Sequence, residues 1–155
     1  MTAAGPAPDA RSVVRALRAA HLHDVSRTDL LHLACERIRA WGAPFTSVYA
    51  YMLSSDELVL ETFAGRDTEH RRIPVGTGVC GTAVAAECDQ NVPDVTAIGN
   101  YLACNTYTKS ELVVLIRRGN VILGQLDVDS DVPAGFGERE HAAVREVAEA
   151  LAVLL

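Results

Sequence analysis

Apolar residues recur every three or four positions in two segments near the N-terminus, and this periodicity predicts two helices. The first runs from Asp9 to about Leu22. The second begins after Ser26, a favourable N-cap residue, and ends before Pro44. Cys35 lies in the apolar stripe of the second helix. Because free cysteine is among the most buried residue types, we expect Cys35 to be a core residue.

Alternation of apolar and polar residues then predicts two β-hairpins. Their strands are Phe45–Leu53 with Leu58–Phe63, and Glu111–Arg117 with Asn120–Val128.

The segment between the hairpins is less regular. It contains a predicted short helix at Gly81–Glu87 and a short edge strand at Asn91–Pro93, where a proline is tolerated. The polar stretch 94–110 is about as long as loops become in compact domains, which favours a functional loop. A terminal amphipathic helix is predicted from Phe136 to the end of the chain.

This order of elements predicts an α+β fold, in which a central antiparallel sheet has the N- and C-terminal helices packed on one face. We expect residues 1–8 to be a flexible tail and residues 9–155 to form a single domain. The helical face also favours a homodimer, because helices from both ends of the chain can pair with those of a second copy.

Composition narrows the class of protein. Of the 155 residues, 49% are hydrophobic and 22% are charged, as in ordinary globular domains. The net charge of −6 argues against a nucleic-acid-binding surface. No apolar run approaches the roughly 20 residues that span a bilayer, and we see no secretory signal. We therefore expect a cytoplasmic protein in a reducing compartment, where structural disulfides are rare.

The four cysteines form no C-x-x-C pair, which argues against zinc-ribbon and thioredoxin-type motifs. Cys104 lies in the long polar loop near Lys109, where it is either a reactive thiolate or an incidental loop residue. Cys80 follows a glycine-rich turn and opens the short helix, whose dipole stabilises a thiolate. Cys88 is flanked by two acidic residues, which makes it a poorer nucleophile.

Three carboxylates are predicted to share one side of the sheet. Asp127 and Asp129 are two residues apart on a strand and therefore point to the same face, and Glu111 opens the neighbouring strand. Such a group can supply a proton, bind a ligand ammonium group or hold a hard metal ion. It can also be the solvated face of a half-exposed sheet. The histidines have no ligand-like spacing, so there is no separate signal for a metal site, and surface or helix-flank positions explain them better.

Several motifs together resemble those of a known family. Their order and spacing are similar to those of the free methionine-(R)-sulfoxide reductases, which are stand-alone GAF-fold enzymes, over roughly Ser47 to Glu140. The motifs are I-P-V-G-T-G-V-C-G-T-A from Ile73, V-P-D-V from Val92, A-C at Ala103, K-S-E-L-V-V from Lys109 and L-D-V-D-S from Leu126.

The resemblance implies a mechanism that needs no cofactor. A cysteine thiolate attacks the sulfoxide sulfur, a carboxyl group protonates the departing oxygen, and the cysteine becomes a sulfenic acid. A second thiol condenses with the sulfenic acid to form a disulfide, which a thioredoxin-type reductant then reduces. The implied residues are Cys104 as nucleophile, Cys80 as the second thiol, Glu111, Asp127 and Asp129 as ligands of the sulfoxide oxygen and the amino group, and Tyr51 as a pocket aromatic.

Two positions differ from the family pattern. The family usually has a third cysteine upstream of the I-P-x-G motif, but residues 67–72 contain no cysteine and His70 lies nearest to that place. Ser47 stands where the family has a tryptophan in the wall of the pocket. Three functions therefore remain open. The first is a reductase that uses Cys80 or Cys88 as its second thiol, or that takes reductant directly. The second is a GAF domain that binds a small amino-acid-like or oxidised ligand without turnover, and the third is a thiol redox sensor or interaction protein.

Overall fold

The computed structural model describes residues 6–99, 101–102 and 106–155. In this part of the chain, six strands form one antiparallel sheet in the order β3-β2-β1-β6-β5-β4. The strands are β1 (Ser47–Ser54), β2 (Glu57–Ala64), β3 (Arg72–Pro74), β4 (Gln90–Val92), β5 (Ser110–Arg118) and β6 (Val121–Ser130).

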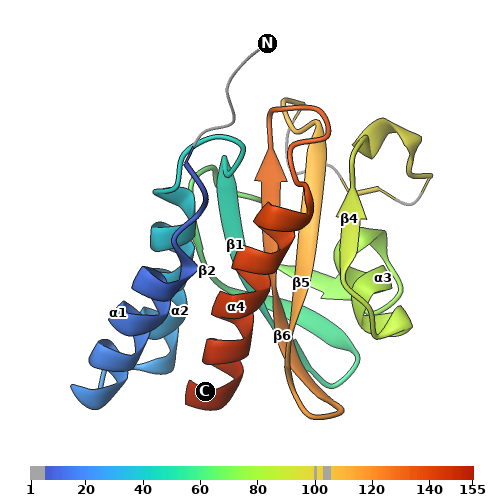
Figure 1. Ribbon diagram of the computed structural model, residues 1–155. Coiled ribbons are helices and arrows are strands. Elements are labelled where there is room, and N and C mark those ends of the chain that lie inside the picture. The colour runs from blue at the N-terminus through green and yellow to red at the C-terminus, as the bar shows by residue number, and fades with distance from the viewer. Residues whose placement is uncertain (1–5, 100, 103–105) are drawn as a thin grey trace.

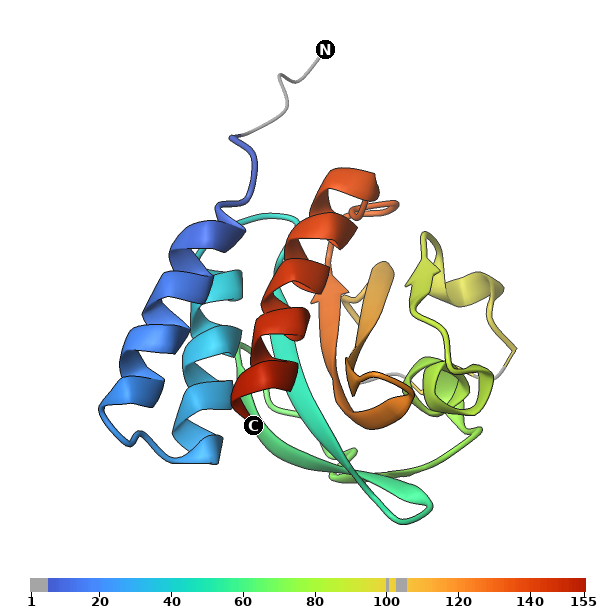
Figure 2. The ribbon, with the colours of Figure 1, turned by 60° about the horizontal axis from the view of Figure 1, so that its bottom comes forward.

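Helices cover both faces of the sheet, but unequally (Figures 1 and 2). On one face lie α2 (Arg27–Arg39) and α4 (Glu138–Leu154), and α1 (Ala10–Leu22) packs mainly against these two helices. The short helix α3 (Gly78–Ala86) lies on the opposite face, beside β5. None of the helices in the described residues has the length and apolar character needed to cross a membrane.

The alternation of side chains along the strands creates two separate apolar cores. On β1, Val48 and Ala50 face the three long helices, and Cys35 of α2 is fully buried in the same core, as predicted. Tyr49 and Tyr51 point to the other face, where they pack with residues of α3. Both faces of the central strands are therefore buried, and the α+β class with terminal helices on one face is confirmed.

Three local predictions differ from the structure. Helix α3 begins at Gly78 rather than Gly81, so Cys80 lies inside its first turn. The strand β3 was not predicted, because its three residues form a strand only by pairing with β2. The loop 94–110, predicted to lack regular structure, contains a short 3₁₀ helix at Val95–Ala97.

The glycines of the G-T-G-V-C-G motif fit α3 closely against the turn that precedes it. Gly78 has a φ of +65°, which favours glycine. At Gly81, a Cβ atom would lie 2.5 Å from the carbonyl oxygen of Pro74 and 2.9 Å from the backbone nitrogen of Gly76. The Gly76 N–H donates to the Gly81 carbonyl at 2.8 Å, and this hydrogen bond joins the turn to the first turns of α3. The motif thus has a structural role, because it fixes the position of the helix that carries Cys80.

We expect Gly81→Ala to lower the free energy of unfolding by about 1–3 kcal/mol, because the new methyl group collides with backbone atoms that cannot rotate away. Urea denaturation measures this change. Gly99→Ala is the matched control, since a Cβ at Gly99 meets no atom within 4 Å. Equal denaturation midpoints for the two variants would contradict this account of the turn.

Candidate active site

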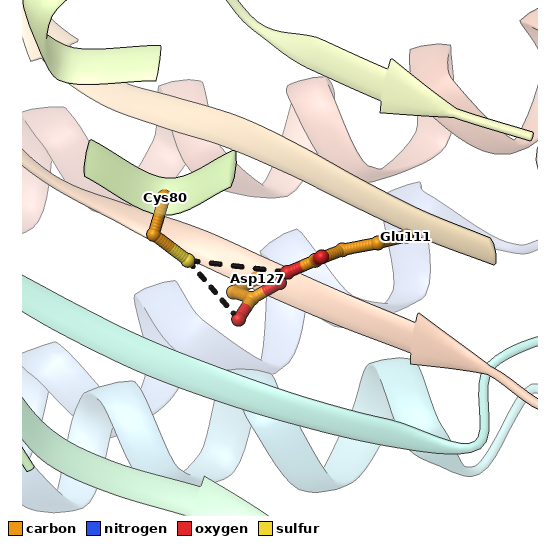
Figure 3. Close-up of side chains that lie close together, drawn as sticks. All are labelled: Cys80, Glu111 and Asp127. Atoms are coloured by element: carbon orange, nitrogen blue, oxygen red, sulfur yellow. Dashed lines mark hydrogen bonds between the residues drawn. The ribbon is translucent and has the colours of Figure 1, made fainter. Parts of the chain in front are cut away.

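Cys80, Glu111 and Asp127 meet on the face of the sheet that α3 covers (Figure 3). The Cys80 thiol donates a hydrogen bond to Oδ2 of Asp127 at 3.2 Å, and its sulfur lies 4.0 Å from Oε1 of Glu111. The three side chains come from α3, β5 and β6 respectively. They are separated by 31 and 47 residues in sequence, so the tertiary fold alone brings them together.

The hairpin of β5 and β6 explains how the carboxylates gather. Glu111 pairs directly with Asp129 across the two strands. Asp127 precedes Asp129 by two residues on β6, so its side chain points to the same face. Glu111 is 5% exposed, Asp127 1% and Asp129 2%. The interpretation of these residues as a solvated polar face is therefore wrong, because α3 and the residues around it cover that side of the sheet.

Burial raises the pKa of the Cys80 thiol well above its ordinary value, and the nearby carboxylates of Asp127 and Glu111 raise it further. The sequence pattern had suggested a thiolate stabilised at the start of a helix. In the structure, the loss of hydration and the adjacent negative charges outweigh the helix dipole. Cys80 is therefore a protonated thiol in neutral solution.

The two aspartates are also held toward their neutral forms. Burial raises the pKa of Asp129 well above its ordinary range, and the neighbouring Asp127 adds to this effect, while a hydrogen bond from the Thr108 hydroxyl opposes it. Burial likewise raises the pKa of Asp127, against hydrogen bonds from Glu111 and Cys80. The site can therefore retain a proton at a pH at which an exposed aspartic acid has lost it.

A narrow pocket opens over the cluster. Its other lining residues are Tyr51, His70, Ile73, Thr77, Gly78, Val79 and Leu102. The free space among these side chains is about 10 Å³, close to the least that holds one water molecule. A ligand the size of an amino acid therefore requires the lining side chains to move apart. Leu102 packs tightly here, since a Cβ on Gly78 would lie 3.0 Å from its Cγ.

Two tyrosines of β1 hold the connection between β2 and β3 against this face. The Tyr49 hydroxyl donates to the carbonyl oxygen of Arg66 at 2.8 Å, and the Tyr51 hydroxyl donates to that of His70 at 2.8 Å. Tyr51 thus contributes an aromatic wall to the pocket and also fixes the backbone of His70 at its rim.

The structure brings most of the predicted site residues together. Tyr51, Cys80, Glu111 and Asp127 line one pocket, and Asp129 lies beside it, paired with Glu111. Cys104, the predicted nucleophile, lies outside the described residues.

Sequence reasoning named neither His70 nor Leu102 as a residue of the pocket. The interpretation of the histidines as surface or helix-flank residues is wrong for His70, which is half-buried in the pocket wall. The signal that could have identified His70 is its position in the sequence, nearest to the place where the family has a cysteine.

Comparison with known proteins places this geometry in a family. No family model matches the chain. The free methionine-R-sulfoxide reductase of Escherichia coli (strain K12) is 39% identical over 105 residues, which cover 68% of this chain and 63% of that protein. The solved structure of free methionine-R-sulfoxide reductase from Neisseria meningitidis in complex with its substrate has a TM-score of 0.86 at 30% identity, covering 99% of this chain and 92% of that chain. The chain belongs to the free methionine-R-sulfoxide reductase family.

The fold of this reductase family member is the GAF fold. A solved GAF domain matches it with a TM-score of 0.79 at 25% identity, covering 94% of this chain and 88% of that chain. The segments that match the curated relatives span less than two thirds of the length of those proteins.

We expect Asp129→Asn to raise the free energy of unfolding at pH 7, measured by urea denaturation in buffer without divalent cations. The raised pKa of Asp129 means that the native protein binds this proton more tightly than the unfolded chain does. The contribution of Asp129 to wild-type stability therefore decreases as pH rises above about 4, whereas asparagine has no proton to lose. The advantage of the variant should grow above about pH 4, level off above the folded-state pKa of Asp129, and shrink in more acidic solution.

Asp131→Asn is the control of opposite sign. Arg66 binds the Asp131 carboxylate at 2.6 and 2.7 Å and lowers its pKa. Since both side chains are more than a third exposed, the loss at pH 7 should be at most about 1 kcal/mol, and it should disappear as pH falls from about 4 through the lowered pKa. An Asp129→Asn protein no more stable than the wild type at pH 7 would refute the description of Asp129 as a buried acid whose pKa is raised.

Proposed function

We propose that this protein reduces free methionine-(R)-sulfoxide to methionine, with Cys104 as the nucleophile and Cys80 as the second thiol. The observation that carries the proposal is the contact between the Cys80 thiol and Asp127 in a buried pocket rich in acidic groups, within a chain that belongs to this reductase family. The role of Cys104 rests on its sequence motif.

In the first step, the Cys104 thiolate attacks the sulfoxide sulfur and forms a sulfur–sulfur bond, and the oxygen takes up a proton. The hydroxyl group then transfers to the Cys104 sulfur while the sulfur–sulfur bond and the sulfur–oxygen bond of the substrate break. The substrate sulfur gains two electrons and leaves as the thioether of methionine, and Cys104 is oxidised to a sulfenic acid. The departing oxygen needs a proton. Asp129 and Asp127, whose pKa values are raised by burial, support the assignment of this proton to the carboxyl cluster that also includes Glu111.

In the second step, Cys80 condenses with the sulfenic acid, which forms a disulfide and releases water. Its raised pKa makes Cys80 a poor first nucleophile, because the thiolate is the reactive form. It suits the second step better, since Oδ2 of Asp127 lies 3.2 Å from the sulfur and can accept the proton as the disulfide forms. A thioredoxin-type reductant would then restore both thiols.

The carboxyl cluster also suits the ammonium group of a free amino acid. Glu111, Asp127 and Asp129 are all nearly inaccessible to water, and a cation that enters the pocket balances the charge of an ionised member. This supports a substrate with a free amino group rather than a methionine sulfoxide residue within a peptide chain. A cytoplasmic location and a homodimer formed through the helical face stay predictions.

The test is production of methionine from free methionine-(R)-sulfoxide, with dithiothreitol and with thioredoxin as reductants. We expect Cys104→Ser to abolish turnover with both reductants. Cys80→Ser should lose turnover with thioredoxin and retain it with dithiothreitol, which reduces a sulfenic acid directly.

Cys88→Ser is the matched control, because Cys88 is exposed and lies outside the pocket. It should turn over like the wild type with both reductants. If the folded wild-type protein makes no methionine but is stabilised by the sulfoxide, the reductase proposal fails and a ligand-binding GAF domain becomes the better interpretation.

A further inference from the structure

The three groups that meet beneath α3 are also a set of metal-ligand atoms. Sγ of Cys80, a carboxylate oxygen of Glu111 and a carboxylate oxygen of Asp127 all lie within 4.8 Å of one another, and all three residues are buried. Sulfur from cysteine and oxygen from aspartate or glutamate are both established ligands of Zn²⁺. The cluster therefore offers three protein ligands, from three different elements of the fold, around one point.

The spacing of these atoms suits a single ion. With a zinc–sulfur bond of about 2.3 Å and a zinc–oxygen bond of about 2.1 Å, two ligands of a tetrahedral ion lie about 3.6 Å apart. Sγ of Cys80 lies 3.2 Å from Oδ2 of Asp127 and 4.0 Å from Oε1 of Glu111, on either side of that value. Side-chain shifts of a few tenths of an ångström would bring both pairs to the coordination distance.

Unpartnered polar atoms beside the cluster provide a second, independent observation. Among residues 6–99, 101–102 and 106–155, Oδ1 of Asp129 has no hydrogen-bond partner, although Asp129 is 2% exposed and pairs with Glu111 across the hairpin. Oδ1 of Asp127, a member of the cluster that is 1% exposed, likewise has no hydrogen-bond partner in the part of the chain that the structure describes. Buried acceptors without partners are costly, and a cation placed among them offsets that cost.

The size and chemical softness of the site define the class of ion. The free space in the pocket is about 10 Å³, which admits an ion or a water molecule with no more than these small side-chain shifts. Mg²⁺ and Ca²⁺ prefer six or more oxygen ligands, so a site with one sulfur and few oxygens selects against them. Zn²⁺ and Cd²⁺ accept sulfur and oxygen together. His70, which lines the same pocket, has a side chain of the type that completes zinc sites.

We propose that Cys80, Glu111 and Asp127 form a binding site for a thiophilic divalent cation of the Zn²⁺ class. Binding displaces the thiol proton of Cys80 together with any proton that the carboxyl groups hold, and a sulfur–metal bond takes its place. A consequence that rests on the proposed function is that the bound ion blocks the second thiol and the carboxylates, so that Zn²⁺ is a reversible inhibitor of sulfoxide reduction.

The binding test uses the full chain carrying Cys88→Ser and Cys104→Ser, in which Cys80 and the deeply buried Cys35 are the remaining cysteines. This background lacks the proposed nucleophile, so the result does not depend on turnover. We expect the reduced, metal-free protein to retain one equivalent of Zn²⁺ in equilibrium dialysis against excess Mg²⁺. Titration with Cd²⁺ should give a thiolate-to-metal charge-transfer absorption that saturates at one equivalent.

Two further substitutions in this background locate the site. Cys80→Ser should remove the charge-transfer absorption and weaken Zn²⁺ binding at least about tenfold, and Glu111→Gln should weaken binding about tenfold while the absorption persists. Circular dichroism verifies that each variant is folded. Absence of retained Zn²⁺ in the background protein overturns the proposal, as does unchanged affinity in either folded variant. If Cys80→Ser does not fold, Glu111→Gln decides the matter alone.

A separate measurement on the wild type keeps the two proposals distinguishable. Zn²⁺ should inhibit methionine formation, and a chelator should restore it. If metal binds as described but no methionine forms even in the presence of chelator, the reductase proposal fails and the metal site stands. If methionine forms and no metal binds, only the metal site is overturned.

Discussion

The burial of acidic side chains between α3 and the β5–β6 hairpin is the constraint on which the site depends. Glu111 and Asp129 face each other across the hairpin, and Asp127 lies on the same face. The Cys80 thiol donates a hydrogen bond to Asp127 from α3 (Figure 3). Loss of hydration favours the protonated forms of Cys80, Asp127 and Asp129. The surrounding structure keeps water out: the glycine-rich turn seats α3, and Tyr51 holds the chain at the rim.

The two faces of the sheet differ in composition, and only one of them holds the proposed site. The face covered by α2 and α4 is an apolar core that includes the buried Cys35, and among the described residues no charged side chain is buried in it. The face covered by α3 combines an apolar core with the acidic groups. In the proposed reaction, the sheet supplies protons and α3 supplies the second thiol. The proposed first nucleophile, Cys104, belongs by sequence to the stretch 94–110.

The sequence predicted much of this arrangement, because periodicity reports which side chains share a face. The two hairpins and the terminal helices followed from it, and the two-residue spacing placed Asp127 and Asp129 on the same side. Coverage of that side by α3 is a tertiary contact, so the choice between a buried and a solvated cluster could not be made from the strand alone. Glu111 lies 31 residues and Asp127 lies 47 residues after Cys80 in the sequence, so no local motif marks the three as a group of ligands.

The most direct test of the proposed pairing of nucleophile and second thiol is a single turnover without reductant. The reduced protein is mixed with one equivalent of free methionine-(R)-sulfoxide, quenched with acid, and its thiols are mapped by peptide mass spectrometry. The account predicts one methionine per chain and a disulfide between Cys80 and Cys104, with Cys35 and Cys88 still free. Formation of methionine while Cys80 remains a free thiol, or no methionine at all, would contradict it.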